Sequence, residues 1–280
     1  MQKSILHNNT IVTFIIPFAS RSFAKDWLLS CIHLKQTILS LLNSADSRLA
    51  IVVVGNDHPG NSFPSDDRVH FITTPRCGQV GIQRDTATMA NDQISKMEIG
   101  WEYVKKHLPS RYVMRMDSDD LLSRHVVGFL ATESGPGYRI SDGWIWSDGE
   151  WLFIEKTEKF DVLCGSSNIF RFDIAEKKFN LQDVCSPIPD YMLAVRTNMN
   201  FSLISNRFHQ YAGNAMALLN MDIAQVPFKA AVYRVGNVNS EMQRMVKFHS
   251  CRQFLGRIRK LRIISQSLKK EFALYPNQKH

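Results

Sequence analysis

Two short, almost entirely apolar runs limit the fold of this chain more than any other feature. They lie at residues 11–16, Ile-Val-Thr-Phe-Ile-Ile, and at residues 49–54, Leu-Ala-Ile-Val-Val-Val. Apolar, β-branched runs without polar alternation are typical of strands buried on both faces of a parallel sheet. Parallel neighbours need a crossover segment, and apolar residues recur at helical spacing from Trp27 to Leu42. The pattern therefore predicts a β-α-β unit.

The alternation of strands and helices continues toward residue 120. A run at residues 69–72 predicts a third strand, and helical spacing from about Asn91 to Pro109 predicts a second helix. Residues 112–116 predict a fourth strand. This alternation predicts an α/β fold with a mostly parallel sheet that is wound right-handed and flanked by helices. Beyond Leu121 the pattern becomes irregular, so we expect a second half of mixed structure.

Three carboxylates, Asp117, Asp119 and Asp120, follow the fourth predicted strand directly. Like charges this close raise each other's proton affinity unless a cation lies among them. Mg²⁺ and Mn²⁺ take such oxygen ligands, usually together with the oxygens of a bound phosphate. In open α/β sheets, ligands gather at the carboxyl ends of the strands. The cluster therefore predicts a metal–phosphate site, and the alternative is a solvated acidic turn or a helix N-terminus capped by Asp.

The net charge of +8 is concentrated at the C-terminal end of the chain. From Lys247 to His280 there are nine Lys and Arg residues and one acidic residue, Glu271, so the rest of the chain is neutral. Apolar residues at helical spacing from Arg252 to Phe272 predict a basic amphipathic helix there. Such a helix lies on an anionic membrane surface or packs its apolar stripe on the protein. We expect no nucleic-acid binding, because no recognition motif accompanies the charge.

The cysteines and the N-terminus indicate a cytoplasmic protein. The five cysteines are odd in number and scattered, which argues against a disulfide framework and a structural zinc site. A reducing compartment fits this usage best. We find no signal-peptide layout and no apolar run approaching the roughly 20 residues of a membrane helix. We therefore expect a cytoplasmic location, with peripheral association at the inner face of the membrane.

Four strings arrive in an order that resembles a known family. They are TFIIPFASR at residues 13–21, IVVVGNDHP at 51–59, YVMRMDSDDLLS at 112–123 and IPDYMLAVR at 188–196. They resemble, in turn, the first strand with its donor loop, the second strand with its base-contacting aspartate, the D-x-D strand end and the catalytic-base helix of the GT-A glycosyltransferases. The family 2-like bacterial members are the most similar. The likeness covers residues 11 to about 130 well, and Pro189 stands where that family usually has an acidic residue.

The resemblance implies a domain layout and an activity. It implies a GT-A (Rossmann-like) domain over residues 1–246, with a nucleotide-sugar-binding half at 1–120 and an acceptor half at 121–246. The basic amphipathic helix would follow at 247–280. The implied reaction is metal-dependent transfer of a sugar, of the hexosyltransferase type, from a nucleotide-diphosphate sugar. A UDP-sugar is the expected donor, and a carbohydrate or lipid-linked hydroxyl in polysaccharide biosynthesis is the expected acceptor. Inversion at the anomeric carbon is expected.

The resemblance also assigns the site residues. Mn²⁺ or Mg²⁺ would be bound by Asp117, Asp119 and His209. Asp190 would be the general base, with Arg196 following on the same helix. The donor would be bound by Pro17, Arg21, Asp57, Lys96, Asp117, Ser118 and Asp119.

Each assignment has an ordinary alternative. Asp57 is alternatively a turn aspartate, Lys96 and Arg21 are alternatively solvated surface residues, and His209 is alternatively a surface or satisfied core residue. Asp190 is equally a helix N-cap, and the base would then be sought among Asp173, Glu176 and Asp183.

Two further segments have open roles. Cys164-Gly-Ser-Ser-Asn168 predicts a turn, which lies beside the sugar or is a plain β-turn. Three tryptophans have two alternative roles, stacking on acceptor sugars or packing in the core. They are Trp144, Trp146 and Trp151.

Other functions remain possible from the sequence. A sugar-1-phosphate nucleotidyltransferase has a related sheet, but it needs a glycine-rich phosphate loop after the first strand. Residues 17–21, Pro-Phe-Ala-Ser-Arg, contain no glycine. A haloacid-dehalogenase-like phosphatase places its D-x-D after the first strand, unlike this chain. A degenerate GT-A module that binds carbohydrate or a partner without turnover is the alternative that is not an enzyme.

Overall fold

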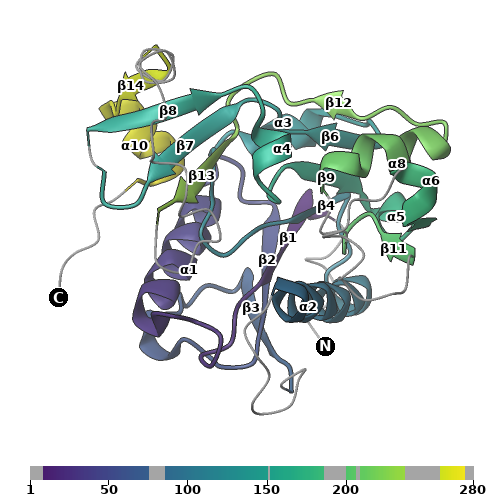
Figure 1. Cartoon of the computed structure of the whole chain (residues 1–280), viewed down its shortest axis with the longest axis horizontal. Helices are drawn as coiled ribbons and strands as arrows, with labels where there is room; N and C mark the ends of the chain where they lie inside the picture. Colours follow the sequence, from purple (N-terminus) through teal and green to yellow (C-terminus); the bar gives the residue numbers. More distant parts are fainter. Residues whose placement is uncertain are drawn as a thin grey trace.

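The computed structural model describes residues 9–75, 86–150, 152–185, 200–205, 209–236 and 259–274. Within these ranges the chain forms two larger β-sheets, a small two-stranded sheet and the helices that cover them (Figure 1). The fold class expected from the sequence, α/β with a mostly parallel sheet flanked by helices, is confirmed.

Seven of the described strands form the first sheet. In spatial order they are β12 (Ala224–Gln225), β6 (Gly137–Arg139), β9 (Asn168–Arg171), β4 (Tyr112–Arg115), β1 (Val12–Pro17), β2 (Leu49–Gly55) and β3 (Val69–Thr73). β1 pairs in parallel with β2 and β4, and β2 pairs in parallel with β3. β9 is antiparallel to both of its neighbours. Strands from before and after residue 120 therefore share one sheet.

The two long helices, α1 (Trp27–Leu42) and α2 (Thr86–His107), cover opposite faces of this sheet. Successive side chains of a strand point to opposite faces. Accordingly Phe14 and Ile16 belong to the core that contains the apolar side chains of α1, whereas Ile15 belongs to the core that contains those of α2. Because both faces are covered, every position of the β1 run is buried. This double burial explains the continuous apolar run in the sequence.

Local sequence sets the ends and the seating of these helices. The side chain of Asp26 caps α1 by accepting the Leu29 N–H at 2.9 Å, and the helix ends at Asn43. On α2, Gly100 permits a close approach to the sheet, because a Cβ there would lie 2.6 Å from Cγ2 of Ile15. The helix therefore packs directly on β1.

The second sheet contains five described strands. In spatial order they are β14 (Leu261–Ile263), β8 (Phe153–Thr157), β7 (Gly143–Ser147), β13 (Ala231–Val235) and β5 (Leu121–Leu122). A separate core that includes Trp146, Val232 and Phe272 covers one of its faces. Phe272 belongs to α10 (Gln266–Phe272), so the C-terminal segment closes this core.

The remaining described elements are short. They are the helices α3 (Val126–Thr132), α4 (Phe160–Leu163), α5 (Phe172–Ala175), α6 (Leu181–Val184) and α8 (Ala212–Leu218), the 3₁₀ helices η2 (Gly60–Ser62) and η3 (His209–Tyr211), and the paired strands β10 (Lys178–Asn180) and β11 (Asn200–Ser202).

The C-terminal segment corrects one prediction. The sequence predicts a continuous amphipathic helix, but Leu261–Ile263 form β14 antiparallel to β8, and within the described part of this tail only Gln266–Phe272 is an α-helix. An open sheet edge was available, and β-branched residues such as Ile263 fit a strand well, so tertiary pairing overrode the helical spacing. Ser265 then caps the short helix by accepting the Leu268 N–H at 3.2 Å. Among the described residues, no helix combines the length and the apolarity that a bilayer crossing requires.

Candidate metal centre at the strand ends

A cavity of about 340 Å³ lies at the carboxyl ends of β1 and β4. The sheet continues from β1 through β2 and β3 on one side and through β4 on the other, so the strand order reverses between β1 and β4. Ligand sites of open α/β sheets form at such a switch point. The residues lining the cavity include six that the sequence predicts for donor or metal binding: Pro17, Lys96, Asp117, Ser118, Asp119 and His209.

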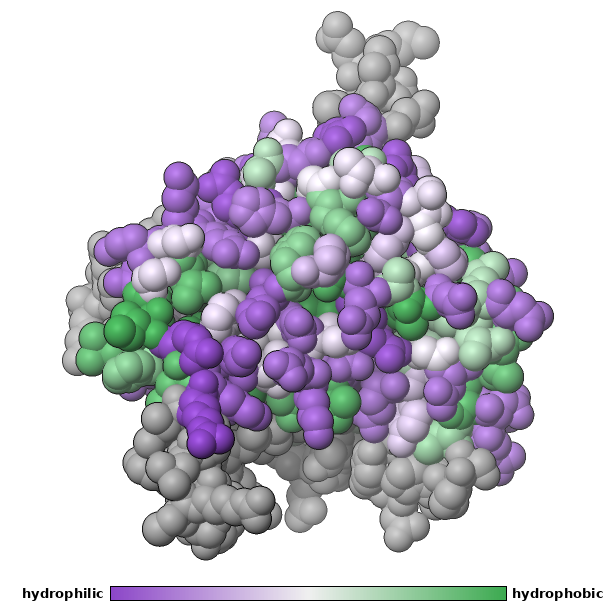
Figure 2. Space-filling view, turned by 90° about the horizontal axis from the view of Figure 1, so that it is seen from above, coloured by the Kyte–Doolittle hydropathy of each residue, from purple (hydrophilic) through white to green (hydrophobic). Residues whose placement is uncertain are grey.

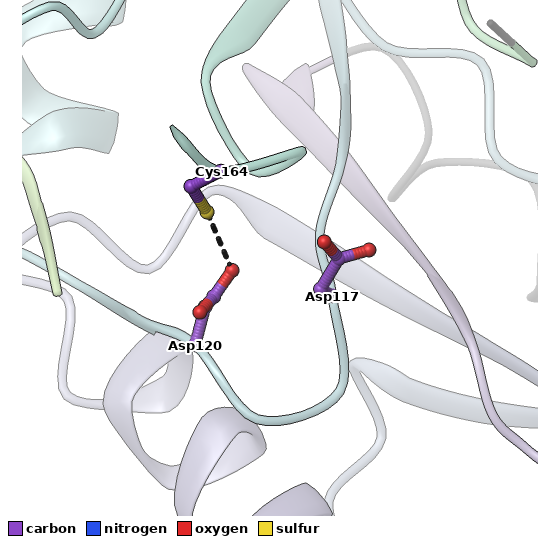
Figure 3. A group of neighbouring side chains, drawn as sticks. All are labelled: Asp117, Asp120 and Cys164. Carbon is purple, nitrogen blue, oxygen red and sulfur yellow. Dashed lines mark hydrogen bonds between the residues drawn. The ribbon is translucent and has the colours of Figure 1, made fainter. Parts of the chain in front are cut away.

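Asp120 is the fully buried carboxylate of the strand-end cluster. Its Oδ2 accepts hydrogen bonds from Cys164 Sγ at 2.8 Å (Figure 3) and from Ser166 Oγ at 2.6 Å. The backbone N–H of Arg234 donates to its Oδ1 at 3.4 Å. Burial raises the pKa of Asp120 well above its ordinary value, and the neighbouring charges of Asp119 and Asp117 raise it further.

Asp117 is only partly buried and lines the cavity. Its Oδ1 accepts hydrogen bonds from the Arg115 guanidinium at 3.0 Å and from the Gln93 amide at 3.1 Å. Its backbone N–H donates to Ser166 Oγ at 2.8 Å. Since the same hydroxyl donates to Asp120, Ser166 links the two carboxylate residues and fixes the strand end against the 164–166 loop.

The structure brings together Asp117, Asp120 and Cys164, whose potential ligand atoms lie within 4.8 Å of one another (Figure 3). Burial raises the pKa of the Cys164 thiol, and the carboxylates of Asp120 and Asp117 raise it further. The thiol therefore stays protonated and donates to Asp120, so oxygen atoms are the ligands that this group offers. Of its two carboxylates, Asp117 lines the cavity and Asp120 is buried next to it. Carboxylate oxygens of this kind fit Mg²⁺ or Mn²⁺, which take oxygen ligands and leave positions for phosphate.

The other predicted metal ligands, Asp119 and His209, line the same cavity. Among the described residues, however, the close group of potential ligands contains Asp120 instead of either of them. His209 begins η3, and its Nε2 lies 3.4 Å from the carbonyl oxygen of Val162. Metal binding by Asp119 and His209 therefore stays a prediction, and Asp120 is a neighbour of the site that the sequence assignment omitted.

Two of the predicted donor-binding residues, Arg21 and Asp57, contact each other. The backbone N–H of Arg21 donates to Asp57 Oδ2 at 2.9 Å, so Asp57 ties the loop after β1 to the end of β2. Pro17, which ends β1, lines the cavity, whereas the described cavity wall includes neither Arg21 nor Asp57. Contact of Asp57 with a nucleotide base stays a prediction.

Lys96 lies on the wall that α2 contributes to the cavity, but it is not an exposed cation. The residue is 1% exposed, and its Nζ lies 2.6 Å from Oδ2 of Asp92, which is 7% exposed. A buried ammonium paired this closely is held in place by its partner. The observed contact of Lys96 is its ion pair with Asp92. Binding of a diphosphate by Lys96 stays a prediction.

The predicted general base, Asp190, lies outside the described residues, as does Arg196. Of the carboxylates considered in its place, Asp173 pairs with Arg171 at 2.6 Å and Glu176 pairs with Lys105 at 3.1 Å, both at exposed positions. The described cavity wall does not include Asp173, Glu176 or Asp183.

Polar side chains that the sequence does not single out also lie at the cavity. His33 of α1 lines it and is 2% exposed, with Nε2 3.5 Å from Asp148 Oδ1. Tyr233 of β13 lines it too, and burial with the nearby carboxylate of Asp120 raises the pKa of this phenol. These groups come from α1, the end of β7 and β13. No sequence spacing predicts that these side chains lie together, because only the fold brings their elements close to one another.

Arg234 and the tryptophans form part of the packing behind the site. Arg234 is fully buried, its guanidinium lies 4.8 Å from the ring centroid of Trp146, and it interacts electrostatically with Asp119. Trp146 is therefore a core residue, as the core-packing alternative predicted, and it is not placed to stack on a sugar. Trp144 lies under Lys229 at 5.9 Å, and Trp151 lies outside the described residues.

The chain has weak likenesses to known proteins. No protein-family model matches it, and no curated protein matches it. The crystal structure of S. aureus TarS 1-349 has a TM-score of 0.42 at 12% identity and covers 80% of this chain and 60% of that one. The crystal structure of S. aureus TarS has a TM-score of 0.38 at 12% identity and covers 82% and 37%. The chain thus spans less than two thirds of these structures, and such likenesses carry neither a family nor an activity over to it.

Proposed function

We propose that this protein is a metal-dependent glycosyltransferase with a GT-A domain over residues 1–246. It moves a sugar from a nucleotide-diphosphate sugar, in this proposal a UDP-sugar, to a hydroxyl of a carbohydrate or lipid-linked acceptor, with inversion. The observation that carries the proposal is that Asp117 and Asp119 line a cavity at the switch point of a mostly parallel sheet. The resemblance of residues 11 to about 130 to the GT-A glycosyltransferases supports the same reaction class.

The strand-end carboxylates suit the departing group. Asp117 and Asp119 would hold Mn²⁺ or Mg²⁺, which stabilises the negative charge that develops on a leaving nucleoside diphosphate. Arg115 is 7% exposed and donates to Asp117 at 3.0 Å, so it fixes the direction of that carboxylate. Asp120 anchors the loop between β4 and β5 by three hydrogen bonds, which it accepts from Cys164, Ser166 and the backbone of Arg234.

The acceptor hydroxyl has to lose its proton as it attacks the anomeric carbon, and Asp190 is the proposed base. Inversion follows if that carboxylate lies on the face opposite the departing diphosphate. Among the described residues of the cavity wall, His33 is the alternative proton acceptor, because its ring lines the cavity and Asp148 Oδ1, 3.5 Å from its Nε2, would orient it.

The alternatives differ in their products. A nucleotidyltransferase would need glycines in the loop after β1, and residues 18–26 contain none. A GT-A module without turnover would bind the nucleotide-sugar but release no nucleoside diphosphate from it.

A thermal-shift screen of nucleotide-sugars, each with Mn²⁺ and with EDTA, tests the proposal. A ligand present at about 100 times its dissociation constant stabilises the folded protein by about 2.7 kcal/mol. We expect a UDP-sugar to raise the melting temperature only with Mn²⁺, and the same sugar to yield UDP on incubation. Stabilisation without release would favour the binding module, and no stabilisation by any nucleotide-sugar would refute the proposal.

A further inference from the structure

The outer edge of the second sheet carries an apolar and basic surface. Leu152, Phe153 and Ile263 are 64%, 42% and 71% exposed. Seven large apolar side chains are exposed in the described part of the chain. Phe153 and Ile263 lie on the strand pair β8–β14, and Leu152 immediately precedes β8. Phe153 and Ile263 are directly paired across β8 and β14, so their side chains share one face. Arg262 pairs with the buried Ile154, so it lies on the opposite face of the edge strand β14 from Ile263, and Arg259 and Lys260 immediately precede this strand. We define the β8–β14 surface, around this sheet edge, by Leu152, Phe153 and Ile263 and by the cations Arg259, Lys260 and Arg262.

The three cations of this surface are exposed. The guanidinium of Arg262 donates to the backbone carbonyls of Arg259 and Leu261 at 2.8 and 2.7 Å, which leaves its charge uncompensated by these contacts. No ion pair between described residues uses Arg259, Lys260 or Arg262. In Figure 2 strongly hydrophilic side chains stand beside a cluster of apolar ones at the left, where Figure 1 places β14 and β8.

Most carboxylates near this surface have other partners. Glu150 Oε1 accepts the backbone N–H groups of residues 152 and 153 at 2.8 and 3.3 Å. Glu271 Oε1 accepts the Ser123 hydroxyl at 2.7 Å, and Glu158 lies 3.8 Å from a neighbouring lysine. Glu155 is half-buried on β8. The described tail, residues 259–274, carries five Lys and Arg residues and one acidic residue, Glu271, so positive charge predominates in this segment.

We propose that the β8–β14 surface binds an anionic lipid bilayer. Phe153 and Ile263 enter the boundary between headgroups and acyl chains, and Arg259, Lys260 and Arg262 contact the lipid phosphates. Bilayers offer both an apolar layer and a negatively charged surface, so they complement both components of this surface. A nucleic acid would contact only the cations and leave the apolar side chains unburied. A second copy of the chain would place its own cations next to these cations, and the like charges would repel.

The surface is also placed to serve the proposed reaction. One row of directly paired residues crosses the second sheet: Tyr233, Ile145, Glu155 and Leu261. Their side chains therefore lie on one face. Phe153 is two residues from Glu155, so it lies on the same face of the sheet as Tyr233 of the cavity wall. This last step rests on the proposed function: a protein held through this face keeps its cavity near a lipid-linked acceptor. Bilayer binding itself does not depend on the reaction.

Vesicle sedimentation with the full-length chain tests the proposal. The vesicles contain phosphatidylcholine alone or with phosphatidylglycerol, at low and at high NaCl. Two variants address the surface: Arg259→Glu/Lys260→Glu/Arg262→Glu, and Phe153→Ser/Ile263→Ser. Two matched controls are Lys178→Glu, an exposed cation on β10, and Leu218→Ser, whose side chain is 52% exposed on α8. Thermal melting verifies that each variant is folded.

We expect the unmodified chain to sediment with the anionic vesicles at low salt and to be released at high salt, because the surface potential is screened. The triple charge reversal is expected to weaken partitioning by about tenfold or more, and the apolar double variant by several-fold. Both controls are expected to bind like the unmodified chain. No sedimentation at low salt, or equal binding by the surface variants and controls, would overturn the proposal. Dimerisation lost in the apolar variant, without vesicle binding, would instead assign this surface to self-association.

Discussion

The thiol of Cys164 donates to the carboxylate of Asp120 at 2.8 Å, although 44 positions separate the two residues in the chain. Ser166 adds a second hydrogen bond to the same oxygen at 2.6 Å. A buried carboxylate without partners is strongly unfavourable, so these contacts compensate its burial. The 164–166 loop and the end of β4 are therefore one structural unit, and this unit positions Asp117 at the cavity.

Gly165→Ala tests how closely this loop approaches the metal centre. A Cβ at this position would lie 2.7 Å from Oδ2 of Asp117, so we expect the carboxylate to be displaced. Disturbing the groups that orient a ligand typically costs about 10–100-fold in metal affinity. The measurement is a Mn²⁺ titration of both proteins. Gly128→Ala in α3, where a Cβ meets nothing within 4 Å, is the control and should leave the affinity unchanged. Equal affinity in the Gly165 variant would contradict the assignment of Asp117.

Lys96→Met tests whether the buried ion pair of α2 is structural. Removal of one partner leaves Asp92 charged and buried, which typically costs about 3–5 kcal/mol in the free energy of unfolding. Urea denaturation measures this cost. On the same helix, Lys105 pairs with Glu102 at 2.8 Å near the surface, so Lys105→Met should cost less than about 1 kcal/mol. If the two substitutions cost the same, Lys96 is not held by Asp92 in the way the structure shows.

Asp66→Asn should change the pH dependence of stability. Hydrogen bonds from Arg68 lower the pKa of Asp66 from 3.8 to about 2. Because the folded-state pKa is the lower one, the carboxylate stabilises the protein above the unfolded-state value and loses this effect as the pH falls through 3.8 toward 2. Allowing for partial exposure, we expect a loss of about 1 kcal/mol at pH 7 that shrinks toward pH 3. A difference between variant and unmodified protein that stays constant over this range would refute the pairing.

Asp190→Asn separates the two roles of that residue. An amide cannot take a proton, so loss of a general base should lower turnover by about 10²–10⁴-fold while nucleotide-sugar binding is kept. An amide caps a helix about as well as a carboxylate does, so a capping role predicts normal turnover. If turnover is normal, His33→Gln is the next variant to assay, because His33 lines the cavity and faces Asp148.

The sequence predicts the strands β1 to β4 of the first sheet but not β6, β9 and β12. Burial on both faces makes β1 and β2 continuously apolar, which is why they are recognisable. The sequence also predicts Asp117 as a site residue, because a carboxylate after a buried strand reaches the strand end wherever the rest of the chain goes. The tail was predicted less well. Residues 261–263 have apolar spacing compatible with a helix, and only the open edge of β8 makes them a strand.

The contacts around Asp120 and His33 could not be predicted from sequence. Cys164 and Ser166 are remote from Asp120 in the chain, and Asp148 is remote from His33, so no local spacing relates them. Their proximity follows from how β7, β9 and α1 are placed in the folded protein. Burial decides their chemistry as well: the same aspartate on a surface would not have a raised pKa.

Isothermal titration of UDP into the full-length protein, with Mn²⁺ and then with EDTA, tests the central claim most directly. The account predicts binding that requires Mn²⁺ and that is lost in Asp117→Asn and in Asp119→Asn, because these carboxylates would hold the cation that receives the diphosphate. Asp67→Asn, at an exposed carboxylate before β3, should bind as the unmodified protein does. UDP binding that is equal in Mn²⁺ and EDTA, or that survives both substitutions at the strand end, would contradict the account.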